Sequence, residues 1–469
     1  MTNQQCLPPK MSLFTITMVA SAFVVSIRNL PMMAETGMQM IFFAVFAAFF
    51  FFLPDALVSA ELASGWPEEG GLYLWVREAF GEKWGFIAIW IQWNYMILSV
   101  IAMFYFVGGA LAYVFAPHLA NDRLFLIIVT LGVVWFFTYL SWHGQTVSSL
   151  ISAVGFLGGV VLPGIVVIIF GFIYILQGNP IQLNWSFTLK NYFPDIRHLS
   201  TLVLLVGFMR AFTGIEAAAN HTKDVIHPQR NFPIAIFFVV IIGIFINVLG
   251  SLSIAIVIPK ANISFVAGIM EAFDVFFTRF HIHWLIPIMG LLVAGGAAGG
   301  ASTWMMGPIK GLFAVLKRGK LPSKLTTTNR FGVPSYLLII QAIVISIASI
   351  LLLLMPNINI AFWVSVALSM MIYVSMYSLM LLSGIRLRYK KANIVRKYTI
   401  PGSHNIGMWL IAGIGLITAI FMFFIAIIPP AELPSGNHIA YISIILISIC
   451  AMLALPFILY SMRKSKKSK

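Results

Sequence analysis

Apolar residues run through this chain in long stretches, separated by short segments rich in glycine, proline and charge. A helix that crosses a membrane needs about 20 mostly apolar residues. The stretches therefore predict an all-α polytopic membrane protein with twelve transmembrane helices. We place them at residues 12–36, 38–63, 84–116, 123–142, 145–177, 199–222, 232–257, 284–312, 334–355, 358–385, 406–429 and 438–461. We expect these helices to form a single transmembrane domain over residues 1–469.

Two segments between the predicted spans have helical character but are not predicted to cross the membrane. Gly70 to Phe80 alternates apolar and polar residues at helical spacing, which predicts a short amphipathic helix at the inner membrane surface. Asn262 to His281 predicts an outer loop with a helical piece, because its three charged residues make a full span unfavourable. These are Glu271, Asp274 and Arg279.

Composition and charge agree with a membrane protein. The chain is 60% hydrophobic and only 9% charged, which excludes an ordinary soluble domain. Its net charge of +15 comes largely from basic clusters between or after spans, at residues 310–330, 386–397 and 463–469. Basic loops are typical of the cytoplasmic side. We therefore expect a multi-pass protein of the cell inner membrane with both termini cytoplasmic, and we exclude nucleic acid as a partner.

No residues are spaced for catalysis or for a cofactor. Cys6 and Cys450 are far apart, and His281 and His283 have no further ligands at metal spacing. The glycine-rich run Gly295–Gly300 has no strand before it, so it suits close helix packing rather than nucleotide binding. We expect no metal, no cofactor and no enzymatic activity.

Four charged residues fall inside apolar stretches, where charge is costly and is usually functional. Arg28 and Glu35 lie in the first stretch, and Arg210 and Glu216 lie in the sixth. The two pairs occupy segments of corresponding order in the two halves of the chain. This pattern predicts a binding site at the midplane of a transporter, where broken helices commonly meet.

Two longer segments resemble a known family. Pro54 to Phe86, PDALVSAELASGWPEEGGLYLWVREAFGEKWGF, is similar to a signature of amino acid permeases in the amino acid–polyamine–organocation superfamily. Gly214 to Pro233, GIEAAANHTKDVIHPQRNFP, resembles their sixth-span motif and the following loop. The resemblance runs from about Ser12 to Tyr460 and is strongest to bacterial glutamate/GABA antiporters.

The resemblance implies a five-plus-five inverted repeat in which helices 1 and 6 are broken. The first repeat would cover residues 12–177, the second 199–385, and two additional helices 406–461. In such transporters the exposed ends of the broken helices bind the substrate.

The resemblance also implies which residues bind substrate. Backbone N–H groups of the unwound part of span one would hold the substrate carboxylate, at Val25, Ser26, Ile27 and Arg28. Carbonyl groups of the unwound part of span six would face its amino group, at Phe212, Thr213, Gly214 and Ile215. Four side chains match residues beside the pocket or the pathway, namely Glu216, Trp304, Tyr373 and Tyr377.

The chain also departs from the family. Many relatives have Gly-Ser-Gly in span one, where only Ser26 matches here, and both Arg28 and Arg210 replace aromatic or apolar residues. The chain ends nine residues after Tyr460. We therefore expect no long C-terminal segment that plugs the cytoplasmic mouth, and any pH gate would lie elsewhere.

The two arginines allow two interpretations. Arginine binds carboxylate through paired hydrogen bonds, so Arg28 or Arg210 would recognise an acidic side chain of the substrate. Alternatively they are neutralised internally, and the more plausible pair is Arg28 with Glu216. Glu35 is seven residues from Arg28, about 10 Å along a helix, which is too far for a direct bond.

These observations predict a secondary active amino acid transporter that works by alternating access. The leading hypothesis is an antiporter of glutamate/GABA-type acidic amino acids or their decarboxylation products. The alternatives are a proton-coupled uptake permease of other specificity and an amino acid sensor that does not transport. The expected partners are amino acid substrates, the lipid bilayer and protons, since Glu216 would either take up a proton or form a hydrogen bond between helices.

Overall fold

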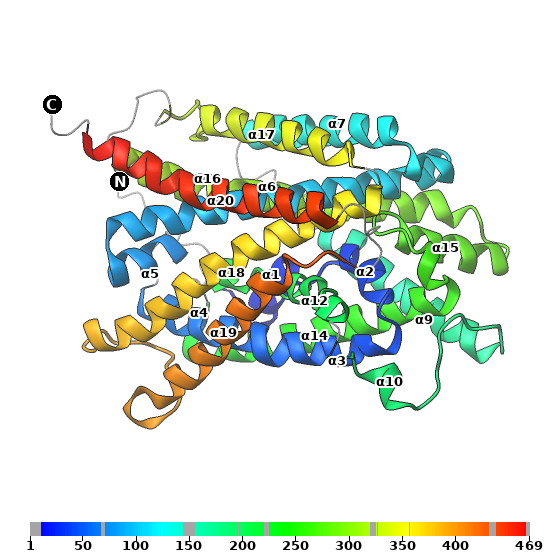
Figure 1. Ribbon diagram of the computed structural model, residues 1–469, viewed down its shortest axis with the longest axis horizontal. Coiled ribbons are helices and arrows are strands. Elements are labelled where there is room, and N and C mark those ends of the chain that lie inside the picture. The colour runs from blue at the N-terminus through cyan, green and yellow to red at the C-terminus, as the bar shows by residue number, and fades with distance from the viewer. Residues whose placement is uncertain are drawn as a thin grey trace, which may run out of the picture.

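A computed structural model describes most of the chain, and Figure 1 shows its helices as a bundle elongated along one axis. The described residues are 11–66, 71–143, 155–195, 197, 199–219, 225–318, 325, 327–355, 357–430 and 438–465. Within these ranges every regular element is a helix, and an isolated bridge joins Met11 to Val225. The all-helical prediction is therefore confirmed.

Long helices follow the apolar stretches of the sequence. The uninterrupted ones are α6 (Glu82–Phe115), α7 (Arg123–Trp142), α14 (Pro228–Val257), α16 (Leu285–Arg318), α17 (Ser335–Leu353), α18 (Ile358–Lys390), α19 (Ile406–Ile425) and α20 (His438–Ser465). Local signals set some of their ends. Asp122 caps α7, because its carboxylate accepts the N–H groups of Leu124 and Phe125 at 2.8 and 3.1 Å.

Other apolar stretches are divided into shorter pieces. The first contains α1 (Leu13–Val24), a 3-10 turn (Ile27–Asn29) and α2 (Leu30–Ala34). The second contains a 3-10 turn (Gly37–Gln39), α3 (Met40–Ala47), a π turn (Ala48–Phe52) and α4 (Leu53–Gly65). The fifth contains a π turn (Leu157–Val161) and α9 (Leu162–Leu176). The sixth contains α11 (Leu199–Leu202), α12 (Leu205–Ala211) and α13 (Ile215–Ala219).

Short elements connect these segments. The helices among them are α5 (Gly71–Phe80), α10 (Leu189–Tyr192) and α15 (Gly268–Arg279), and the 3-10 turns are Pro117–Asn121, Lys260–Asn262 and Ser403–Asn405. The helical piece expected within residues 262–281 is confirmed as α15. The helix expected at residues 70–80 is confirmed as α5. Its residues Leu72 to Val76 are all buried and it packs against α6 and α18, so it is more enclosed than an inner-surface helix would be.

Nine helical segments among the described residues are long and apolar enough to cross a membrane, which makes this a polytopic membrane protein. The predicted bounds agree with the structure to within a few residues in most places. Helices α16 and α18 continue past the predicted ends, because basic residues at their C-termini suit the helix while adding nothing to the apolar signal. Parts of the predicted spans 145–177 and 199–222 lie outside the described residues, at 145–154 and 220–222.

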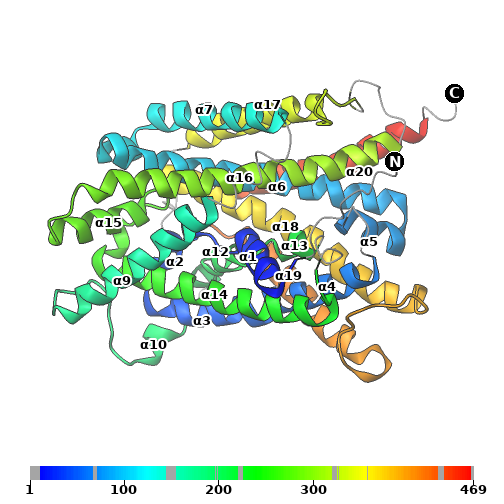
Figure 2. The ribbon, with the colours of Figure 1, turned by 180° about the vertical axis from the view of Figure 1, so that it is seen from behind.

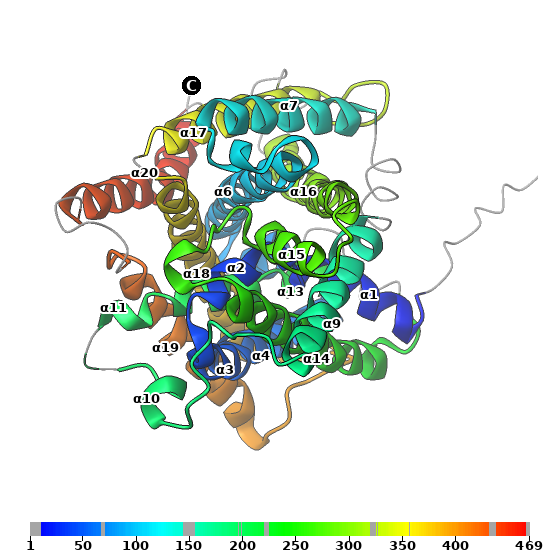
Figure 3. The same cartoon turned by 90° about the vertical axis from the view of Figure 1, so that its right-hand side faces the viewer.

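The most enclosed helices lie in the middle of the bundle. Most side chains of α6 and α18 are buried, whereas α20 is largely exposed. Figure 3 shows α7, α17 and α20 at the edge of the bundle, outside α6 and α18. Close backbone contact holds α16 against the segment before α9, since a Cβ atom on Gly296 would lie 2.5 Å from the Cα atom of Gly159. The glycine-rich run therefore serves helix packing, as expected.

Candidate functional site

The helix of the first apolar stretch ends at Val24 and the chain becomes extended. Val25 has φ −83° and ψ 124°, and Ser26 has φ −148° and ψ 128°. Branched side chains on either side of Ser26 favour extended backbone, and Pro31 has no N–H group to offer a continuous helix. A break of this kind leaves backbone N–H and C=O groups free for other partners.

A second break separates α12 from α13, at Phe212 to Gly214. Gly214 has φ +110°, a conformation that other residues rarely adopt. A Cβ atom there would lie 2.9 Å from the Trp304 ring and 3.0 Å from the carbonyl oxygen of Phe23. Glycine is therefore needed at this position, both for the backbone angle and for the close approach to Trp304 and to the Phe23 carbonyl. The approach to Phe23 places the second break beside the first.

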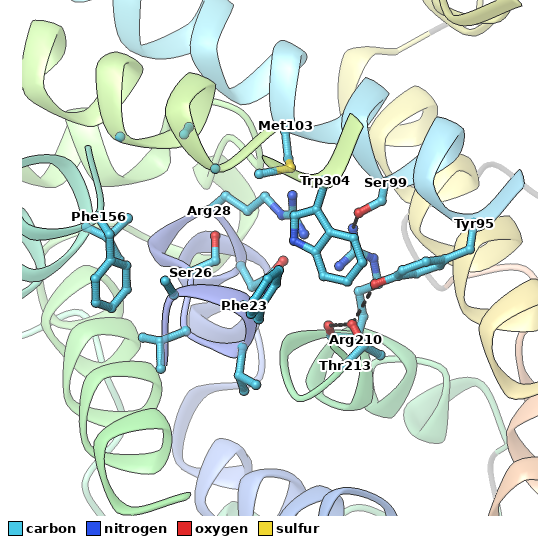
Figure 4. Close-up of a pocket in the computed structure, with 18 residues that line it drawn as sticks. Phe23, Ser26, Arg28, Tyr95, Ser99, Met103, Phe156, Arg210, Thr213 and Trp304 are labelled. Atoms are coloured by element: carbon cyan, nitrogen blue, oxygen red, sulfur yellow. Dashed lines mark hydrogen bonds between the residues drawn. The ribbon is translucent and has the colours of Figure 1, made fainter. Parts of the chain in front are cut away.

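A cavity lies beside the two breaks. Its lining residues are Ala22, Phe23, Val24, Val25, Ser26, Arg28, Asn29, Tyr95, Ser99, Met103, Phe156, Val160, Arg210, Thr213, Gly296, Ala297, Gly300 and Trp304. Figure 4 shows many of them converging from several helices. The cavity volume is ≈ 40 Å³. One buried water needs about 10–15 Å³ of such space, so an amino acid enters only if the lining moves.

The two arginines of the breaks face this cavity without a carboxylate. Nε and Nη1 of Arg28 are buried and have no hydrogen-bond partner. Arg210 donates to Ser99 at 2.7 Å and to Ser369 at 3.1 Å, and its guanidinium lies 5.7 Å from the centre of the Tyr95 ring. No ion pair between described residues involves either arginine.

Of the two interpretations of the arginines, the one in which Arg28 pairs with Glu216 is therefore not what the structure shows. Glu216 is held instead by Tyr373, and Arg28 lies close enough to Arg210 for the two guanidinium groups to repel each other. Burying charge without a counter-charge is costly. The cavity is thus suited to a ligand group that carries negative charge.

Aromatic residues form one wall of the cavity. Trp304 meets the rings of Phe23 and Tyr95 edge-on, with centroids 5.7 and 5.8 Å apart. Thr213 donates its single hydroxyl proton to the carbonyl of Arg210 at 2.9 Å, so Tyr95 is the donor in its 2.8 Å bond with Thr213. These bonds hold the wall against the second break.

A carboxyl cluster lies directly behind the second break. The Tyr373 hydroxyl is 2.8 Å from Oδ2 of Asp55 and 2.7 Å from Oε2 of Glu216. The same hydroxyl oxygen accepts the N–H group of Gly214 at 3.2 Å. One helical turn further along α18, Tyr377 donates to the carbonyl of Phe51 at 2.8 Å, within the π turn of residues 48–52.

Comparison with known proteins places the chain in a family. The family model described as amino acid permease matches residues 11–450. The chain belongs to the amino acid permease family. It is 38% identical to an uncharacterized transporter of Legionella pneumophila, over 91% of each chain. It is also similar to the glutamate/gamma-aminobutyrate antiporters of two Lactococcus lactis strains, at 34% and 35% identity over 97% of this chain and 91% of theirs. The protein is therefore a transporter rather than an enzyme.

The structure of this permease separates the expected site residues into two groups. Those that line the cavity are Val25, Ser26, Arg28, Arg210, Thr213 and Trp304. Those that do not line it are Ile27, Phe212, Gly214, Ile215, Glu216, Tyr373 and Tyr377. Of the second group, Gly214, Glu216 and Tyr373 belong to the hydrogen-bonded cluster behind the break.

Several residues that line the cavity of the permease were not among the predicted site residues. Tyr95 of α6 is bonded to Thr213 of the second break, and Ser99 of α6 accepts a bond from Arg210, which lies at the end of α12 just before that break. Tyr95 and Ser99 are four residues apart, so they lie on one face of the helix. Two polar residues on one face of an apolar span are a sequence pattern that could have indicated a contribution of α6 to the site. Met103 and Phe156 also line the cavity, but as apolar residues in apolar stretches they carry no such signal.

Proposed function

We propose that this permease exchanges acidic amino acids of the glutamate type, or their decarboxylation products, across the membrane by alternating access. The observation that carries the proposal is the pair of guanidinium groups, Arg28 and Arg210, which face one cavity without a carboxylate partner among the described residues. Two relatives are glutamate/gamma-aminobutyrate antiporters, and their similarity extends over most of the chain.

We further propose that the substrate lies between the two breaks. Its α-carboxylate would accept N–H groups from Ser26 to Arg28, whereas the N–H group of Val25 is already bonded to the carbonyl of Ser21 at 2.7 Å. The amino group of the substrate would face carbonyls of Phe212 to Ile215. The guanidinium of Arg28 would bind the side-chain carboxylate, since two of its nitrogens have no other partner. Arg210, held by two serines, would add positive charge from a fixed position.

The proposed architecture is the five-plus-five inverted repeat with twelve membrane crossings. Residues 12–177 and 199–385 would be the repeats, and residues 406–461 the two additional helices. Breaks in the first and sixth apolar stretches, both beside the cavity, support this assignment.

The test is transport by the purified protein in liposomes that are preloaded with glutamate. External labelled amino acids are supplied as a panel of acidic, neutral and basic compounds together with γ-aminobutyrate. We expect glutamate and its decarboxylation product to exchange and basic amino acids to fail. Exchange confined to neutral or basic compounds would contradict the proposal. Uptake into empty liposomes under a proton gradient would favour a proton-coupled uptake permease, and saturable binding without counterflow would favour a sensor.

A further inference from the structure

The carboxyl cluster behind the cavity contains more hydrogen bonds than its tyrosine can supply. A tyrosine hydroxyl has one proton to donate and two lone pairs to accept with. The Tyr373 oxygen accepts the N–H group of Gly214, which uses one lone pair. It also makes short contacts of 2.8 and 2.7 Å with carboxyl oxygens of Asp55 and Glu216.

Only one of those two carboxyl contacts can use the tyrosine proton. In the other contact the proton must come from the carboxyl group, which then donates to the second lone pair of Tyr373. The cluster as it stands therefore includes one protonated carboxyl group, shared between Asp55 and Glu216.

The surroundings favour the same protonation state. Asp55 and Glu216 are buried, and Oδ1 of Asp55 and Oε1 of Glu216 have no hydrogen-bond partner. No ion pair between described residues involves either one. Two neighbouring carboxylates without a cation cannot both stay ionised in a medium of low dielectric constant.

The other titratable groups on the helices packed around the cluster do not neutralise its two carboxyl groups. Tyr95 of α6 is engaged with Thr213, Tyr377 of α18 with Phe51, and Arg210 of α12 with two serines. Helices α1 and α19 contain no aspartate, glutamate, lysine, arginine or histidine. The charged side chains of the remaining neighbours, α5 and α14, lie outside the cluster's hydrogen bonds; they are Arg77, Glu78 and Arg230.

We propose that Asp55, Glu216 and Tyr373 form a proton-binding site that holds one proton in this conformation and releases it when the second break moves. Its three members come from α4, α13 and α18, and the N–H group of Gly214 links it to the break. Thr213, the neighbour of Gly214, lines the cavity. A displacement of α13 would separate Glu216 from Tyr373 and expose a carboxylate to water. The coupling to transport rests on the proposed function, whereas the bound proton does not.

Infrared spectroscopy of the purified full chain tests the bound proton directly. The wild type should show the C=O stretching band of a protonated carboxyl group at neutral pH. Asp55→Asn and Glu216→Gln should each remove it, because the amide can donate to Tyr373 and the remaining carboxylate accepts the tyrosine proton. Glu82→Gln is the matched control and should leave the band in place, since Glu82 also accepts a tyrosine hydroxyl, that of Tyr73 at 2.8 Å, but lies outside the cluster. A wild type without the band, or a band that survives in both cluster variants, would overturn the proposal.

Transport in liposomes tests the release step. Wild-type exchange should fall by up to tenfold per pH unit once the pH is high enough to remove the shared proton. In Asp55→Asn, whose amide replaces the protonated acid, exchange should change less than twofold over the same range. If the wild type and Asp55→Asn have identical pH profiles of exchange, the proposed release of the proton is wrong. Absence of exchange in the wild type at every pH would instead contradict the proposed function, and the infrared band would still decide whether the proton is bound.

Discussion

At the scale of single residues, the two arginines distinguish this chain from an ordinary amino acid pocket. Both are expensive to bury and neither is neutralised by a carboxylate among the described residues. Their position beside two helix breaks, which expose backbone groups, supports the proposed role of both arginines in binding the substrate. Substrate selectivity should therefore respond to the arginines more strongly than stability does.

We predict that Arg28→Ala raises the KM for glutamate by roughly 10- to 100-fold, the equivalent of losing about 1.5–3 kcal/mol of charged hydrogen bonding. The KM for any neutral amino acid that the protein accepts should change much less. Uptake kinetics in liposomes measure both values. The control is Arg386→Ala, which removes an arginine stacked on Phe80 away from the cavity. An equal loss for acidic and neutral substrates would show a structural role instead.

At Gly214 both the backbone angle and the space around the residue require glycine. Gly214→Ala must place a side chain at φ +110° and against both Trp304 and the Phe23 carbonyl. We expect a loss of more than about 1 kcal/mol in stability and a loss of transport. Gly413→Ala is the control, because that glycine lies inside α19 with nothing within 4 Å of the added atom. Thermal unfolding in detergent should separate the two variants, and equal melting temperatures would contradict the assignment.

At the scale of elements, one ionic cluster fastens the C-terminal end of α4 to α18 and the loop after it. Glu61 accepts two bonds from Arg388, one of them 2.7 Å long, and the N–H group of Ile400 at 2.8 Å. Arg396 lies 3.6 Å from the same carboxylate and stacks over Trp66. These contacts anchor α4, the helix that positions Asp55, from a point far along the chain.

Removing the carboxylate should loosen this anchor. Glu61→Gln leaves two largely buried guanidinium groups without a counter-charge, and breaking a buried pair from one side costs about 3–5 kcal/mol. We expect a clearly lower melting temperature. Arg197→Ala, which removes an exposed partner of Asp195, should leave the melting temperature unchanged. The interpretation fails if both variants melt alike.

At the scale of the whole molecule, charge and shape indicate one orientation. Figures 1 and 2 show α5 and the C-terminal ends of α18 and α20 at one end of the bundle, with α10 and α15 at the other. The basic residues of the segment 386–397 lie at the first end. Because basic residues are in excess in cytoplasmic loops, we propose that this end is the cytoplasmic one.

This orientation predicts the labelling of single cysteines in whole cells. In a chain whose Cys6 and Cys450 are replaced by serine, Lys260→Cys should react with an impermeant thiol reagent from outside. Lys391→Cys should react only after the membrane is opened. Both lysines are exposed in the structure. Lys260 lies in the turn before α15 and Lys391 directly follows α18, and Figure 1 shows α15 and the C-terminal end of α18 at opposite ends of the bundle. The reverse pattern would place the termini outside the cytoplasm.

The sequence by itself determined the class of the protein, most helix bounds and the two segments that carry the cavity arginines. These features are local, since apolar length predicts a span, and a charged residue with a nearby glycine or proline marks an irregular one. The sequence also predicted an amino acid permease, which the family match confirms.

Tertiary structure decided which of these residues meet. Asp55 and Tyr373 are 318 residues apart, and the bond that joins them leaves Glu216 beside a second carboxyl group rather than beside Arg28. Tyr95 and Ser99 likewise became part of the site only through the packing of α6 against the second break. Such contacts depend on which helices pack together, and the pattern of apolar residues along one helix does not specify its partner. A charged residue inside an apolar stretch can be recognised from the sequence, but the residue that it contacts depends on the tertiary structure.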